Sequence, residues 1–171
     1  MTTLTDKWTN GYSKAEIDAA QEKFDLQFPP DLVDLLLDRR PKDGHDWRDE
    51  VAIRRMLNWP FEMLLFDVEH NGLWWPEWGP KPLAPEDRKG ALRHVLMQAP
   101  RLIPLYSHRF LPETPSEVGN PVFSVYGADS IIYGANLEDY FQREFSHSGK
   151  ALLPEDVKHI SFWSKLVDRN Y

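Results

Sequence analysis

The chain has 171 residues, no cysteine, and a net charge of −7 from 27 acidic and 20 basic side chains. The length fits one domain with a core of its own, and the lack of cysteine excludes disulfides, thiolate catalysis and cysteine-ligated metals. The acidic balance argues against a nucleic-acid partner, because binding to a phosphate backbone needs clustered Lys and Arg.

Targeting signals are not evident in the sequence. Residues 1–14 are polar and do not have the apolar core of a signal peptide. No apolar run approaches the roughly 18 residues of a membrane span. We therefore expect a cytoplasmic protein without a membrane partner.

The first half of the chain begins with two predicted helices. Ser13 and Glu16 have the S-x-x-E spacing of a capping box, which predicts a helix over 14–24. Asp31 can open a second helix whose apolar stripe continues to Arg39. Residues 1–12 carry no periodic pattern, so we expect a loose N-terminal segment.

A third helical pattern covers 47–70. Pro60 should break or restart this helix and leave a short apolar segment over 61–68. Residues 71–80, rich in Trp, Gly and Pro, should be irregular. Pro85 suits the first position of a further helix, because its missing N–H is not needed there.

Strands are predicted in the second half. Residues 101–106 read as a strand in which Pro104 indicates an edge position or a bulge. Residues 121–126 alternate between two faces, and 127–129 form a short hairpin loop before 130–133 return.

Two more helices follow these strands. Asn136 caps one of them, and the last begins near Ser161. Helices, then strands, then helices predict an α+β fold: a single domain over 1–171, with a mostly antiparallel sheet and helices packed around it.

Asp67 and Glu69, beside His70, are the nearest approach to a metal-binding cluster. In an extended segment the two carboxylates share a face and could seat a hard cation, whereas on a helix they lie about 200° apart. A solvated helix end explains them equally well. We expect no metal and no cofactor.

His108, Arg109, Asp129 and Tyr133 lie on the predicted strands and turns. Brought together, they would form an acid–base cluster, and a hydrolase using His108 and Asp129 is one hypothesis. The alternative is structural: Arg109 pairs with a carboxylate and His108 holds the turn. The sequence contains neither a nucleophile elbow nor a Gly-rich phosphate loop, which favours the structural interpretation.

Trp74, Trp75 and Trp78 cluster within five residues. Tryptophan is enriched at interface hot spots and stacks on sugars, so a small-ligand or sugar-binding site is a further hypothesis. Because Trp is highly buried on average, ordinary core packing is the simpler interpretation.

With these residues laid out, the chain resembles the SUKH superfamily, which includes the yeast cell-wall synthesis regulators and many bacterial immunity proteins, and it is most similar to a bacterial subgroup. The resemblance covers most of residues 13–168. It rests on FPPDL at 28–32, FDVEHN at 66–71, LIP at 102–104, HRFLP at 108–112, GNPVFSVY at 119–126 and IIYG at 131–134.

The resemblance implies a non-catalytic domain that binds another protein. Such a domain is either an immunity-type protein that neutralises a basic, nuclease-like toxin or a regulatory interaction module. We expect a monomer or weak homodimer, and an acidic surface is compatible with a basic partner. The candidate binding residues are Asp67, Glu69, Trp74, Trp75, Trp78, His108, Arg109, Asp129 and Tyr133.

Overall fold

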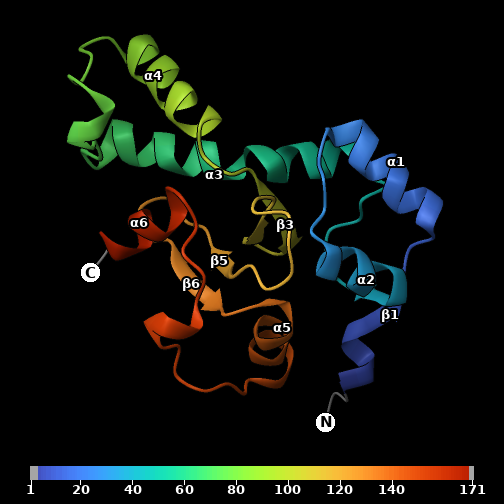
Figure 1. Cartoon of the computed structure of the whole chain (residues 1–171). Helices are drawn as coiled ribbons and strands as arrows, with labels where there is room; N and C mark the ends of the chain where they lie inside the picture. The colour runs from blue at the N-terminus through green and yellow to red at the C-terminus, as the bar shows by residue number, and fades with distance from the viewer. Residues whose placement is uncertain (1–3, 170–171) are drawn as a thin grey trace.

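The centre of the fold is a four-stranded antiparallel sheet with the strand order β3-β4-β5-β6 (Figure 1). A computed structural model describes residues 4–169 of the chain. The strands are β3 (Leu102–Tyr106), β4 (Arg109–Pro112), β5 (Val122–Ser124) and β6 (Ile131–Gly134). Because each strand pairs with the next in sequence, the sheet is a simple meander. The antiparallel α+β domain expected from the sequence is confirmed.

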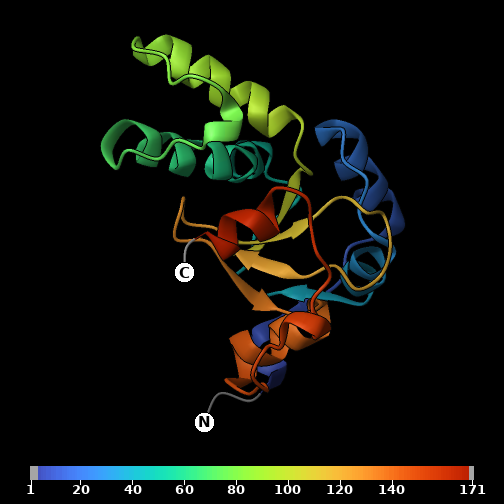
Figure 2. The same cartoon turned by 60° about the vertical axis from the view of Figure 1, so that its left-hand side comes forward.

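Helices cover both faces of this sheet. In two views of the molecule, α3 and α4 lie together on one side of the sheet and α5 lies on the opposite side (Figures 1 and 2). The α-helices of residues 4–169 are α1 (Lys14–Phe24), α2 (Pro30–Asp38), α3 (Glu50–His70), α4 (Pro85–Met97), α5 (Leu137–Ser146) and α6 (Trp163–Asp168). Short 3-10 helices are η1 (Leu4–Lys7), η2 (Pro76–Trp78) and η3 (Pro154–Asp156).

The sheet separates two hydrophobic clusters. Neighbouring residues of one strand join different clusters, as Phe110 and Leu111 do in β4 and Val122 and Phe123 do in β5. Leu111 and Val122 pack with residues of α1, α2 and α5, whereas Phe110 and Phe123 pack with residues of α3, α4 and α6. All four side chains are fully buried. The period of two along each strand thus fills both faces with apolar residues.

Side-chain caps explain where several helices begin. At α1, the Ser13 hydroxyl accepts from the Glu16 N–H while the Glu16 carboxylate accepts from the Ser13 N–H, which is the predicted capping box. At α5, the Asn136 side chain accepts from the Asp139 N–H. Both predicted helix starts are confirmed.

Pro60 does not interrupt α3, contrary to expectation. The helix continues from Glu50 to His70 through Pro60, which is buried. A proline inside a helix costs about 3 kcal/mol or more, because it removes a hydrogen bond and crowds the preceding turn. Ile53, Phe61, Leu64 and other apolar residues on both sides of Pro60 are buried in the core. Their burial outweighs the local penalty, and the expected separate segment 61–68 is instead the second half of one helix.

Pro104 lies in an edge strand, as its missing N–H requires. Strand β3 is at the end of the sheet order, and its register with β4 shifts between Pro104 and Tyr106. The prediction of an edge position or a bulge is confirmed in both respects.

The N-terminal segment is ordered over much of the length that was expected to be loose. Strand β1 (Trp8–Asn10) pairs with β2 (Arg39–Pro41) in a separate two-stranded sheet. Tyr12 is buried and its N–H donates to the Leu36 carbonyl. The expectation for 4–12 is therefore corrected, and residues 1–3 lie outside the described residues. Over residues 4–169, none of the helices has the length and apolar character needed to cross a lipid bilayer.

Candidate functional site

The tryptophan cluster is part of the core. Trp75 is 6% exposed and its ring stacks on Trp78, with ring centroids 5.2 Å apart. The Trp75 ring also contacts Phe162, at 5.2 Å between ring centroids, and the Arg169 guanidinium lies 4.1 Å from the Trp75 centroid. The Trp74 ring meets Trp78 edge-on, and Trp74 and Trp78 are only partly exposed. The cluster therefore holds the C-terminal helix α6 against η2.

Glu77 strengthens this attachment from outside the aromatic cluster. Its carboxylate accepts hydrogen bonds from Lys165 and Arg169 of the C-terminal segment. Hydrogen bonding by Arg169 is the main cause that lowers the pKa of Glu77 to about 2. Glu77, Lys165 and Arg169 are thus engaged with one another within the chain, which leaves few polar groups beside the tryptophans for a sugar hydroxyl to contact.

Asp67 and Glu69 contact different parts of the molecule. The Asp67 Oδ2 accepts from the Ala128 N–H at 2.7 Å and so holds the β5–β6 turn against α3. The Glu69 carboxylate instead forms a two-bond ion pair with Arg88 of α4, at 2.9 and 2.7 Å. Within residues 4–169 no group of three or more potential ligand side chains is arranged to hold a metal ion.

The structure brings His108, Arg109 and Tyr133 together at the α5 side of the sheet. The Arg109 Nε donates to the Glu144 carboxylate at 3.2 Å, and its Nη1 donates to the Ser124 hydroxyl at 2.8 Å. Its guanidinium lies 4.2 Å from the centre of the Tyr133 ring. Arg109 thereby links β4, β5, β6 and α5, and this supports the structural interpretation of the residue.

His108 is half-buried beside Arg109. Its Nδ1 lies 3.1 Å from the Ser107 hydroxyl and its Nε2 lies 2.6 Å from the Arg109 Nη1. Burial, and next the Arg109 charge, lower the pKa of His108 below its usual value. The ring therefore stays uncharged at neutral pH.

Asp129 does not join this cluster. Its backbone N–H donates to the Tyr126 carbonyl, and its exposed carboxylate forms no hydrogen bond or ion pair with His108 or with any other group in the described residues. A general base needs a partner within about 3 Å to orient it. The geometry required by a hydrolase that uses His108 and Asp129 is thus not formed in this structure.

Tyr140 adds a buried hydroxyl next to the same cluster. It is fully buried, and its hydroxyl is the single buried side-chain polar atom of residues 4–169 without a hydrogen-bond partner. Burial, helped by the nearby Glu144 charge, raises its pKa strongly. The phenol is consequently neutral, and it acts as a packing group at the α5–β6 contact.

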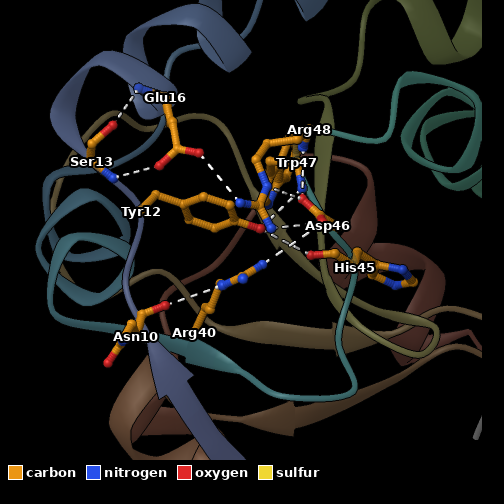
Figure 3. A network of polar contacts seen from close by, with 9 residues as sticks. All are labelled: Asn10, Tyr12, Ser13, Glu16, Arg40, His45, Asp46, Trp47 and Arg48. Atoms are coloured by element: carbon orange, nitrogen blue, oxygen red, sulfur yellow. Dashed lines mark hydrogen bonds and ion pairs between the residues drawn. The ribbon is translucent and has the colours of Figure 1, made fainter.

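A second polar network surrounds Tyr12 (Figure 3). The Tyr12 hydroxyl accepts from the Trp47 N–H at 3.0 Å, and the Arg40 and Arg48 guanidinium groups lie 4.9 and 5.7 Å from the ring centre. Asp46 accepts two hydrogen bonds from the Arg48 side chain. These opposite charges pair with one another, and the network attaches the loop before α3 to the start of α1.

An open groove lies elsewhere, between α2, the β1–β2 sheet, the loop 113–121 and α5. Its volume is about 760 Å³. Both apolar and polar side chains line it: Trp8, Asp31, Leu35, Arg39, Val118, Gly119, Asn136, Leu137, Glu138, Phe141, Gln142 and Ser146. We call this the α2/α5 groove. None of the nine candidate binding residues lies in it.

Acidic side chains border the α2/α5 groove. Asp31 and Glu138 line it directly, and among the described residues of its lining Arg39 is the one basic group. Asp34 and Asp38 are exposed on α2 but are not part of the lining, and Asp38 pairs with Arg39 at 3.9 Å. A groove of this kind favours an apolar ligand that also carries positive charge.

The sequence contains a signal for one wall of this groove. Leu35 lies beside acidic residues at 31, 34 and 38, so the outer side of α2 is partly apolar in addition to the face buried through Leu32 and Leu36. The other wall depends on α5 and β1 lying next to α2, and short-range patterns do not predict that arrangement.

Comparison with known proteins identifies no relative of this chain. Protein-family models, curated proteins and solved structures all yield no match to this chain. The similarity to the SUKH superfamily therefore remains a prediction that rests on the residues quoted above.

Proposed function

We propose that this protein is a non-catalytic binding domain that captures a positively charged protein in the α2/α5 groove. The observation that carries the proposal is the composition of that groove: an apolar lining of Trp8, Leu35 and Phe141 beside the carboxylates of Asp31 and Glu138. Apolar area supplies affinity, and complementary charge supplies specificity and rapid association.

Two further observations support binding over catalysis. The titratable groups singled out by sequence, Asp67, Glu69 and Arg109, are each engaged in contacts that hold elements of the fold together. The α2/α5 groove, in contrast, is open and includes a carboxylate, Glu138, that forms no hydrogen bond or ion pair within residues 4–169. This unused charge is available to a partner.

The finer form of the proposal follows the SUKH resemblance. On this view the domain is an immunity-type protein in the cytoplasm, a monomer or weak homodimer, and its partner is a basic, nuclease-like toxin domain. The net charge of −7 agrees with such a partner and opposes binding to nucleic acid itself.

Affinity capture with a matched pair of variants tests the proposal. Leu35→Arg places a positive charge in the groove, whereas Leu83→Arg makes the same change at a position that is 96% exposed and outside the groove. We expect the native protein and Leu83→Arg to retain the same basic protein from lysate of the source cells, and Leu35→Arg to lose it. Equal retention by all three would contradict the proposal.

A further inference from the structure

The two ends of the α2/α5 groove are lined by different side chains. Trp8 packs against Phe141 and Phe145, at 4.8 and 5.3 Å between ring centroids, so it lies beside the C-terminal half of α5. Arg39, directly after α2, places its guanidinium 4.2 Å from the Trp8 ring centre. The C-terminal ends of α2 and α5 therefore lie near Trp8, where the Arg39 charge is already paired with Asp38 at 3.9 Å.

The acidic end is at the other ends of these two helices. Asp31 is in the first turn of α2 and Glu138 is in the first turn of α5. Asp31 accepts hydrogen bonds from the Leu32 and Gly119 N–H groups, at 3.1 and 3.0 Å. A carboxylate offers about four lone-pair sites, so Asp31 can still accept from a ligand cation.

The distance between Asp31 and Leu35 along α2 is close to the distance between alternate residues of an extended peptide. Asp31 and Leu35 are one helical turn apart, which is about 6 Å along the axis. In an extended chain, residues i and i+2 point to the same side and are about 6.6 Å apart. A cationic residue beside Asp31 and Glu138 therefore places the residue two positions away over Leu35, where a large apolar side chain fits.

From this geometry we infer that the α2/α5 groove recognises an extended protein segment with Lys or Arg two positions from a large apolar residue. The ten residues of α5 span about 15 Å, which corresponds to four or five residues of an extended chain. This inference rests on the proposed function and adds the chemistry of the ligand.

A displayed library of random seven-residue peptides tests the inference without the natural partner. The library is selected on the native protein and counter-selected on Leu35→Arg. We expect enrichment of Lys or Arg two positions from Leu, Ile, Phe, Met or Trp. Enriched sequences without this pairing, or no sequence that distinguishes the two proteins, would overturn the inference.

A selected peptide then gives a second measurement that does not depend on Leu35. Glu138→Lys should weaken its binding about fivefold, because one favourable exposed charge pair is replaced by a repulsive one. Glu86→Lys is the matched control, since Glu86 is likewise exposed in the first turn of a helix, α4, outside the groove. Equal affinities of these two variants would also overturn the inference.

The two proposals can fail separately. If a cellular protein is lost on Leu35→Arg but the library shows no cation–apolar pairing, the proposed function stands and the peptide inference fails. If peptides with the cation–apolar pairing are enriched but no cellular protein is lost on Leu35→Arg, the inference about the groove stands and the proposed function fails.

Discussion

The Arg109 Nη1 lies 2.6 Å from the Nε2 of its neighbour His108. A guanidinium has only donors, so the Nε2 of His108 must be the acceptor and carries no proton. The proton of the neutral ring is then on Nδ1, which faces the Ser107 hydroxyl at 3.1 Å. Protonating His108 would place an N–H against the Arg109 N–H, so this pair favours the uncharged imidazole.

We therefore predict that the pKa of His108 in the folded protein lies below its ordinary value of 6.5. Burial is the main cause, and the Arg109 charge adds to it. The Glu144 carboxylate acts in the opposite direction, so Glu144→Gln should lower the pKa of His108 further. A two-dimensional NMR titration of the imidazole protons measures both values. A native pKa above 6.5 would show that this hydrogen bond does not form.

Stability should decrease when the pH falls below about 6.5. His45 and His108 both have folded-state pKa values lower than in the unfolded chain, in both cases mainly through burial. In this range the unfolded chain binds more protons than the folded protein, so the free energy of unfolding declines as the pH falls. Urea denaturation at about pH 7 and about pH 5.5 checks the sign. A double variant, His45→Gln with His108→Gln, should show a smaller decrease than the native protein.

Arg109→Met should destabilise the fold by about 2 to 4 kcal/mol, because it leaves a poorly solvated carboxylate without its partner. The side chains of Arg109 and Glu144 are only 13% and 15% exposed. Arg54→Met is the matched control, since Arg54 pairs with Glu50 where both side chains are about half exposed; it should cost less than about 0.5 kcal/mol. Both values come from urea unfolding. Similar costs for the two variants would mean that Arg109 does not join the strands to α5 as described.

Two glycine-to-alanine changes should have opposite effects on stability. Gly127 has a φ of +61°, and an added Cβ would lie 2.1 Å from the Asp67 Oδ2. Gly127→Ala should therefore cost about 1 to 3 kcal/mol. Gly90 lies within α4 with open space around it, so Gly90→Ala should stabilise by about 0.5 to 1 kcal/mol. Thermal unfolding measures both, and stabilisation by Gly127→Ala would contradict the described turn.

The local signals of the sequence predicted much of the fold. Ser13 with Glu16, Pro85 and Asn136 mark helix starts through contacts within one turn, so a short stretch of sequence is enough to find them. The edge or bulge position of Pro104 was also predicted correctly, because a residue without an N–H is restricted to such positions in a sheet. The helix break predicted at Pro60 was wrong, because the apolar residues of α3 pack against distant parts of the chain and this packing keeps the helix continuous.

The candidate site was harder to predict, since residue type alone does not show what a side chain contacts. The structural interpretation had Arg109 pair with a carboxylate, but the sequence did not connect Arg109 with α5, which supplies Glu144, and left open whether Tyr133 lies beside it. For Trp75 the sequence favoured core packing over a ligand platform, and its burial and its contacts with Phe162 and Arg169 agree with the core. The α2/α5 groove was missed because Trp8, Leu35 and Phe141 meet only in the folded chain.

The central claim is that the α2/α5 groove binds a positively charged partner, and the dissociation constants of two charge-reversed variants test it most directly. With the captured partner, Glu138→Lys should bind at least about threefold more weakly than Glu86→Lys, in a manner that high salt reduces. Glu86→Lys should match the native protein. Equal dissociation constants for Glu138→Lys and Glu86→Lys at low salt would contradict the account.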